Sequence, residues 1–126
     1  MDDCIFCQIV NNKLPAHIIY QENQVIAFLD NNPKEAGHIL VIPKEHFSDL
    51  LEIPASLLAT TIKAVQKVAQ IINQKLSPDG LNICQNNGLL AGQTINHFHF
   101  HIIPCYQKKP AINKEDLQTI VKILKK

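Results

Sequence analysis

The residues of this chain best suited to chemistry are three histidines at alternate positions of one apolar segment, His97, His99 and His101. Alternate residues of a β-strand point to the same face of a sheet, so the three imidazoles would share one face and Phe98 and Phe100 the other. Burying three imidazoles side by side costs solvation free energy unless each has a partner, so the grouping indicates a functional site. A metal ligand, a nucleophile and a proton carrier all remain open roles, because spacing alone does not choose among them.

Several short β-rich segments and helices are predicted to position this segment, which we expect to be a strand over residues 96–104. Strands are also predicted at residues 17–20 and 25–29, forming a hairpin, and at 37–43 and 81–85. Residues 4–10 are predicted to form a helical turn, 54–76 a long helix, and the segment from about Lys114 a short terminal helix. The loop at 86–94 contains glycines and amide side chains that suit close approach to a ligand.

The predicted helix at 54–76 has a wide apolar face. Its first apolar line consists of Leu58, Ile62, Val65, Ala69, Ile72 and Leu76, and a second line of Leu57, Thr61, Ala64, Val68 and Ile71. One such line is enough to cover a sheet, so the extra width leaves apolar surface for another chain.

Length and charge limit the classes of function. A chain of 126 residues is predicted to form one domain, and its net charge of +1 gives no sign of a nucleic-acid or membrane partner. All twelve basic residues are lysine, which excludes a bidentate guanidinium clamp on phosphate within one chain. The acidic start, Met1-Asp2-Asp3, is unlike a signal peptide and no apolar run reaches the length of a membrane span, so we expect a cytoplasmic protein.

The four cysteines are predicted to be thiols or thiolates rather than disulfides. Cys4 and Cys7 form a CxxC pair, a half-site for a tetrahedral metal, whereas Cys84 and Cys105 lie in apolar, strand-like runs. The alternative for the CxxC pair is two small residues on one helix face, and a metal would need two more ligands from elsewhere in the chain.

Taken together, these motifs resemble the histidine triad (HIT) family of nucleotide-binding hydrolases and transferases. The segment HFHFHII matches the triad pattern without a gap, and CIFCQI, AFLD, GHILVIPKEH and GQTINHFHFHIIP follow one another in the family's order. The likeness covers nearly the whole chain. It implies a single HIT domain over residues 1–126 with an α+β fold, a five-stranded antiparallel sheet and one long and one short helix per protomer. It also implies a homodimer with a ten-stranded sheet.

The resemblance further implies roles for individual residues in a nucleotidyl hydrolase. His99 would be the nucleophile that attacks the α-phosphorus of a purine nucleoside phosphoramidate or a related nucleoside monophosphate conjugate, without a catalytic metal. His101, His38 and the first triad residue His97 would complete the catalytic group. The substrate-binding residues implied by the family are Ile5, Phe6, Ile9 and Phe28 for the base, Asp30 for the ribose, and Asn86, Gln93 and Thr94 for the phosphate or leaving group. Imidazole and amide donors can stabilise charge on phosphate, which accounts for a site without arginine.

Bacterial members of the family with a similar CxxC pair imply a structural zinc. Its ligands here would be Cys4, Cys7, His46 and His97, with about one zinc per chain. The chain departs from its relatives in having Cys105 where many carry arginine, in Asn31 at a position that is often apolar, and in lacking a tryptophan-containing tail. These departures leave the natural substrate and the base preference open.

Three alternative functions remain. The first is hydrolysis of dinucleoside polyphosphates, and the second is a zinc-stapled nucleotide-binding module with little turnover. The third places all three triad histidines in one catalytic metal site. A His99→Ala variant separates enzyme from binding module, because only an enzyme would lose its turnover.

Overall fold

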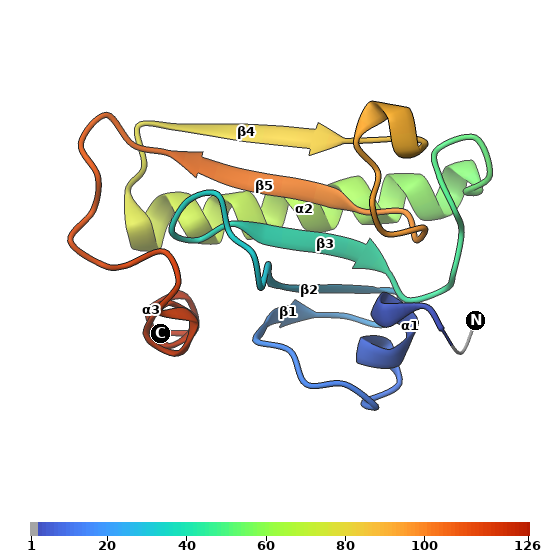
Figure 1. The fold of residues 1–126 in the computed structure, drawn as a ribbon, viewed down its shortest axis with the longest axis horizontal. Coiled ribbons are helices and arrows are strands. Elements are labelled where there is room, and N and C mark those ends of the chain that lie inside the picture. Colours follow the sequence, from blue (N-terminus) through green and yellow to red (C-terminus); the bar gives the residue numbers. More distant parts are fainter. Residues whose placement is uncertain (1–2) are drawn as a thin grey trace.

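Five antiparallel strands in the order β1-β2-β3-β5-β4 form the centre of the computed structural model, which describes residues 3–126 (Figure 1). The strands are β1 (Ile18–Gln21), β2 (Val25–Leu29), β3 (Ile39–Pro43), β4 (Gly80–Gln85) and β5 (Phe100–Cys105). The predicted hairpin is present, since β1 pairs with β2. Met1 and Asp2 of the acidic start lie outside the described residues.

Helices lie on both faces of this sheet. The long helix α2 (Ala55–Leu76) runs behind the strands in Figure 1, and α3 (Leu117–Leu124) packs against α2 and β1. On the opposite face, the short helix α1 (Ile5–Val10) packs Phe6 and Ile9 against β2 and β3. A 3-10 turn, η1 (Leu89–Ala91), interrupts the loop between β4 and β5. Within residues 3–126, no helix combines the length and apolarity that crossing a membrane requires.

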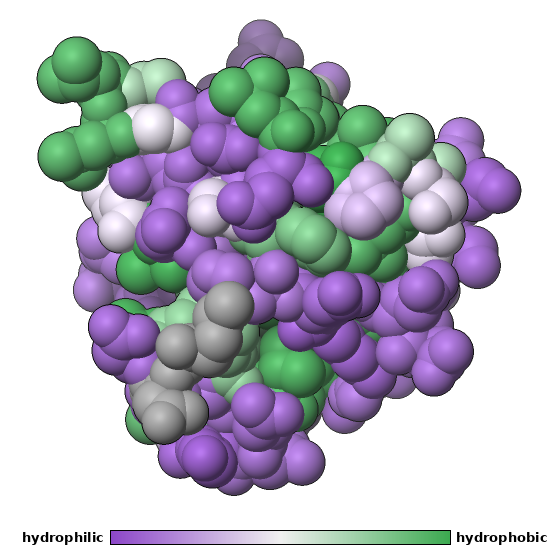
Figure 2. Space-filling view, turned by 90° about the vertical axis from the view of Figure 1, so that its right-hand side faces the viewer, coloured by the Kyte–Doolittle hydropathy of each residue, from purple (hydrophilic) through white to green (hydrophobic). Residues whose placement is uncertain are grey.

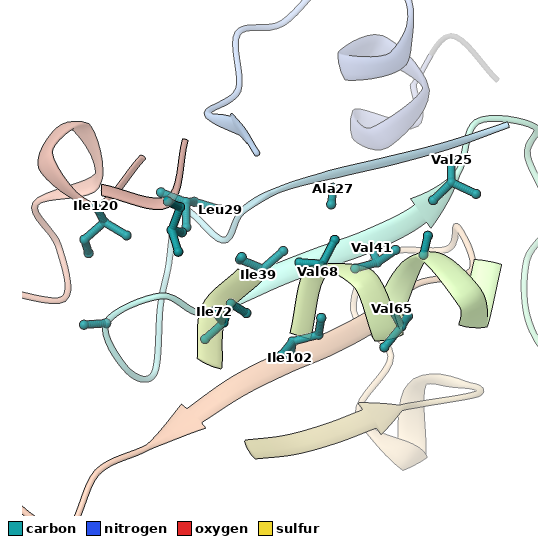
Figure 3. Close-up of a cluster of buried hydrophobic side chains, with 13 residues drawn as sticks. Val25, Ala27, Leu29, Ile39, Val41, Val65, Val68, Ile72, Ile102 and Ile120 are labelled. Carbon is teal, nitrogen blue, oxygen red and sulfur yellow. The ribbon is translucent and has the colours of Figure 1, made fainter. Parts of the chain in front are cut away.

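Alternation along the central strands divides the core into two layers. Figure 3 shows Val65, Val68 and Ile72 of α2 pointing toward β3 and β5, where they contact the side of the sheet that carries Val41 and Ile102. The neighbouring residues on the same strands, such as Leu40, point the other way and pack beneath α1. The sheet thus keeps one face for α2 and leaves the other, next to α1, for a ligand.

Some predicted element boundaries are wrong. The histidine strand begins only at Phe100, because the backbone N–H of Phe98 donates to the carbonyl of Phe47 (2.7 Å) instead of entering the ladder. The strand at 37–43 begins at Ile39. The terminal helix begins at Leu117 rather than near Lys114, because the carboxylate of Asp116 caps it by accepting from the backbone N–H of Thr119.

Both apolar lines of α2 contribute residues to the core. Its fully buried residues are Leu57, Thr61, Ala64, Val65, Val68 and Ile72, most of them from the second line. Ile62, from the first line, is 43% exposed. The helix therefore does present apolar surface beyond what the sheet covers, as the width of its face predicted.

Candidate active site

A cavity of about 550 Å³ opens on the sheet face that α1 partly covers. Most of the residues predicted for the site line it: Ile5, Phe6, Ile9, Phe28, Asp30, His38, Asn86, Thr94, His99 and His101. The sheet register brings them together, since Leu40 of β3 and Cys84 of β4 both pair with His101 of β5. Residues far apart in the chain therefore share one wall.

One end of the cavity is apolar and aromatic. Phe6 of α1 and Phe28 of β2 meet edge to face with ring centroids 5.5 Å apart, and Ile5 and Ile9 extend this wall. The ring of Phe6 also meets the ring of His99 at 5.3 Å and 89°. Such a slot suits a flat aromatic ligand placed beside the imidazole.

His99 is held in one tautomer. Its Nδ1 lies 2.7 Å from the backbone carbonyl oxygen of His97, which can only accept, so Nδ1 carries the proton and donates. Nε2 is then left with a free lone pair. Burial lowers the pKa of His99, although the carbonyl of His97 and the charge of Asp30 oppose the shift. The imidazole is therefore neutral and competent as a nucleophile at neutral pH.

A second chain of hydrogen bonds joins His38 to His101. The backbone N–H of Lys34 donates to Nδ1 of His38 (3.1 Å), so the proton of His38 resides on Nε2. That Nε2 lies 3.1 Å from Nδ1 of His101 and 3.4 Å from a carboxylate oxygen of Asp30. Burial, followed by the charges of His99 and His38, lowers the pKa of His101 to about 4. His101 is therefore neutral, with its own proton on Nε2.

The ligand atoms of Asp30, His38 and His101 lie within 4.8 Å of one another, close enough to suggest a metal. A metal on Nε2 of His38 would force the proton onto Nδ1, where the N–H of Lys34 already points. This arrangement suits a hydrogen-bonded chain better than a metal ligand set. The alternative that places all three triad histidines in one metal site is wrong, because the ring of His97 faces another cluster.

That other cluster consists of Cys4, Cys7, His46 and His97. Nδ1 of His97 lies 3.5 Å from Sγ of Cys4 and 3.6 Å from Sγ of Cys7, and Nδ1 of His46 lies 3.3 Å from Sγ of Cys7. Zinc bonds of about 2.3 Å to sulfur and about 2.0 Å to nitrogen give a tetrahedral S···N edge of about 3.5 Å. The spacing of this donor set therefore fits a tetrahedral zinc.

The protonation of the cluster also fits a metal. Nε2 of the fully buried His97 donates to the carbonyl of Pro43 (2.8 Å), which leaves Nδ1 free to face the cysteines. Without a metal, burial and the neighbouring Cys4 raise the pKa of Cys7 to about 11, so the thiol of Cys7 stays protonated at neutral pH. A divalent cation would favour the ionised form instead, because it binds thiolates. All four cysteines of the chain are free of disulfides.

Gln93 does not line the cavity, contrary to the role that the family resemblance implied. Its amide oxygen accepts from the N–H of Gly88 (2.8 Å), and its amide nitrogen donates to the carbonyls of Ser48 (2.6 Å) and Ile95 (3.1 Å). The side chain is thus used entirely to hold the loop before β5 against the loop at 48–52. Asn86 and Thr94 do line the cavity.

The loop before β5 and the loop at 48–52 together form an apolar rim near η1. Leu51 is 91% exposed and Leu90 fully exposed. Figure 2 shows apolar patches at the upper edge of the face that carries these loops. The backbone N–H of Leu50 donates to the side chain of Asn87 (2.8 Å), which ties the two loops together a second time.

Several residues of the cavity were not predicted from the sequence. Cys84 and Ile103 lie on the site face in register with the histidines, a position that strand alternation could have revealed. Lys34 lines the cavity from the loop between β2 and β3. Its sequence neighbourhood carries no periodic signal, so only the fold identifies it.

Comparison with known proteins finds one family model and several similar proteins. The model of the HIT domain family matches residues 11–108. An uncharacterized HIT-like protein of Methanocaldococcus jannaschii is 44% identical over 128 residues, covering 97% of this chain and 98% of that protein. An adenosine 5′-monophosphoramidase of Schizosaccharomyces pombe is 42% identical, covering 80% of this chain and 73% of its own. An adenylylsulfatase of Arabidopsis thaliana is 39% identical, and the match covers 82% of this chain and 52% of that protein.

Solved structures agree with these relatives. A hypothetical histidine triad nucleotide-binding protein of Sulfolobus tokodaii superimposes with a TM-score of 0.91 at 36% identity, covering 97% of this chain and 89% of that one. A zinc-bound histidine triad family protein of Mycobacterium smegmatis superimposes with a TM-score of 0.90 at 34% identity, and the match covers 98% of this chain and 91% of that one.

Proposed function

The chain belongs to the histidine triad (HIT) family, and on this basis we propose that it is a nucleotidyl hydrolase. Its substrate would be a purine nucleoside phosphoramidate or a related nucleoside monophosphate conjugate, cleaved at the α-phosphorus. Support comes from relatives named adenosine 5′-monophosphoramidase and adenylylsulfatase.

The observation that carries this proposal is the tautomer of His99. Its proton is held on Nδ1 by the carbonyl of His97, so the bare Nε2 belongs to a neutral imidazole in the wall of the cavity. The aromatic slot at Phe6 and Phe28 would bind the base, and Asp30 the ribose hydroxyls. The phosphate would then lie against His99, His101 and Asn86.

In the proposed reaction, Nε2 of His99 attacks the α-phosphorus and forms a covalent nucleotidyl-histidine. The bond to the leaving nitrogen breaks, and that nitrogen departs as an amine. Water then cleaves the labile P–N bond to His99. Overall one water molecule is consumed: the leaving nitrogen takes a proton from solvent in the first step, and in the second step the hydroxyl group of water bonds to the phosphorus while its other proton returns to solvent. The Nε2–H group of His101 would donate a hydrogen bond to a phosphate oxygen, in place of the missing arginine.

Intact-mass spectrometry after rapid quenching tests this proposal. Wild-type protein mixed with adenosine 5′-phosphoramidate should gain the mass of one adenylyl group, and the His99→Ala variant should not. His17→Ala is the matched control, since His17 belongs to neither histidine cluster, and it should form the adduct as the wild type does. A His99→Ala variant that still turns over substrate would refute the assignment. A folded wild type with neither adduct nor turnover would favour the nucleotide-binding module.

We also propose a structural zinc at Cys4, Cys7, His46 and His97. Zinc would fix the start of α1 to the segment before β5 and supply no step of the reaction. The distances between the sulfur and nitrogen atoms of these side chains and the zinc-bound relative support this assignment.

We further propose a homodimer in which two sheets join through β4. Within the described sheet β4 pairs only with β5, so its outer edge is unpaired. Ile83 on this strand is 44% exposed and Ile62 on α2 is 43% exposed. An open edge beside apolar side chains is stabilised by pairing with another strand, and a second copy would give a ten-stranded sheet.

We propose finally that the chain forms a single HIT domain and acts in the cytoplasm. A reducing compartment would keep its four free cysteines available as thiols or as zinc ligands.

A further inference from the structure

Cys4 and Cys7 lie one helical turn apart at the start of α1, in a geometry that suits a disulfide. Cys4 precedes the first helical residue, and its carbonyl accepts from the backbone N–H of Gln8 (3.0 Å). Residues three apart in such a turn have Cα atoms about 5 Å apart, within the range of about 4.4–6.8 Å found for disulfides. Sγ of Cys4 accepts from the backbone N–H of Cys7 (3.3 Å), and the two sulfur atoms lie within 4.8 Å of each other.

The other two cysteines cannot bridge to each other in this fold. Cys84 pairs with His101 and Cys105 pairs with Gly80, so the two thiols lie four residues apart along neighbouring strands. That offset is about 13 Å, beyond the reach of a disulfide. Neither thiol belongs to the cluster around Cys4 and Cys7.

A second cavity, of about 350 Å³, gives small molecules access to the CxxC pair. Cys4 and His46 line this cavity, whereas Cys7 does not. A small oxidant that enters here would therefore meet Sγ of Cys4 first. The sulfur of Cys7 lies next to it, in position to complete a disulfide.

Two neighbours connect the CxxC pair to the active site. Phe6 lies between the cysteines in the sequence, and its ring meets the rings of His97 (5.8 Å) and His99 (5.3 Å). Nδ1 of His97 faces both sulfur atoms and carries no proton, so its partner must be a thiol proton or a metal ion. A disulfide offers neither. The ring of His97 would then lose its partner, and a shift of His97 or Phe6 would displace His99, whose Nδ1–H donates to the carbonyl of His97.

We propose that Cys4 and Cys7 form a redox site, in which oxidation by a peroxide closes a reversible disulfide and displaces His99. Sγ of Cys4 attacks one oxygen of hydrogen peroxide, the O–O bond breaks, water leaves and Cys4 becomes a sulfenic acid. Sγ of Cys7 then attacks the sulfur of Cys4, the S–O bond breaks and a second water leaves. Two thiols thus lose two electrons and two protons, and the peroxide becomes two water molecules. With zinc bound, the two protons come from solvent and the metal ion is released, because a disulfide has no thiolate to hold it.

Mass spectrometry tests the disulfide directly. Reduced wild-type protein treated with a small molar excess of hydrogen peroxide should lose about 2 Da, and peptide mapping should place the disulfide between Cys4 and Cys7. The double variant Cys84→Ser/Cys105→Ser keeps only the CxxC pair and should form the same disulfide. Wild-type protein that keeps four alkylatable thiols, or that is oxidised first at Cys84 or Cys105, would overturn the proposal.

NMR of protein labelled with ¹⁵N-histidine tests the link to the active site. Oxidation should shift the ring nitrogen signals of His97 and His99 and leave those of His17 in place, and dithiothreitol should restore them. A disulfide that leaves the His99 signals unchanged would overturn the link.

The effect on activity rests on the proposed function. Turnover of adenosine 5′-phosphoramidate should fall by up to about 100-fold on oxidation, the scale expected when a reacting group is misplaced by about 1 Å, and should recover on reduction. The disulfide and the NMR signals of His99 are measured without turnover. They therefore separate a failure of this inference from a failure of the proposed function.

Discussion

The backbone carbonyl of His97 accepts a hydrogen bond of 2.7 Å from Nδ1 of His99, while the ring of the same His97 faces Cys4 and Cys7. One residue therefore belongs to both clusters: its carbonyl fixes the tautomer of His99, and its imidazole completes the cysteine–histidine set. Any change that moves the His97 backbone should affect the orientation of His99 as well.

Loss of the proposed zinc should destabilise the whole domain. Cys7→Ser should reduce the metal content from about one zinc per chain to near zero and lower the free energy of unfolding by several kcal/mol. Metal analysis and thermal unfolding measure the two effects. The control is Cys105→Ser, a thiol outside the cluster, which should keep both metal and stability. Freshly purified wild-type protein without metal would contradict the zinc assignment.

The stability of the protein should fall in mild acid through His101. Its pKa in the folded state is about 4, below the ordinary value near 6.5, so between these values the unfolded chain binds a proton that the folded chain does not. The contribution to the free energy of unfolding therefore decreases as pH falls from about 6.5 to about 4, by roughly 3 kcal/mol at most. Above pH 6.5 both states are neutral and no such contribution arises.

Denaturant unfolding at several pH values checks this effect. His101→Gln should show a shallower loss of stability below pH 6.5 than the wild type does. His17→Gln, which removes a histidine outside the two clusters, should follow the wild-type curve. Parallel curves for wild type and His101→Gln would show that the folded His101 protonates normally.

Gln93 should act on stability and loop order rather than by touching substrate. Gln93→Ala removes bonds to Gly88, Ser48 and Ile95 and leaves buried groups unsatisfied, so we expect a loss of about 1–3 kcal/mol. Faster hydrogen exchange at the Gly88 amide should accompany it. Gln74→Ala, which removes an exposed amide side chain from α2, is the control. A large loss of substrate affinity with unchanged stability and exchange would instead return Gln93 to the phosphate site.

The proposed dimer should dissociate when charge is placed on the β4 edge. Ile83→Lys puts a charged side chain on a half-exposed strand residue, and light scattering at micromolar concentration should report a monomer for the variant and a dimer for the wild type. Leu51→Lys, which changes an even more exposed residue in the loop at 48–52, should remain dimeric. A monomeric wild type would refute the interface.

The sequence by itself determined most of the fold and much of the candidate site. Period-two alternation separated Phe98 and Phe100 from His99 and His101, and Phe98 and His99 indeed belong to the core and the cavity respectively. Period-3.6 spacing located α2 to within one residue. These signals are local, because a side chain's face depends on backbone geometry over a few residues.

The tertiary structure alone decided which distant groups meet. The register of β3, β4 and β5 places Leu40 and Cys84 on either side of His101. A single hydrogen bond from Phe98 to Phe47 removes His97 from the strand and turns it toward the cysteines. The loop that pins Lys34 against His38 likewise has no periodic signature. Pairings of this kind depend on long-range hydrogen bonds and packing, which the spacing of residues along the chain does not encode.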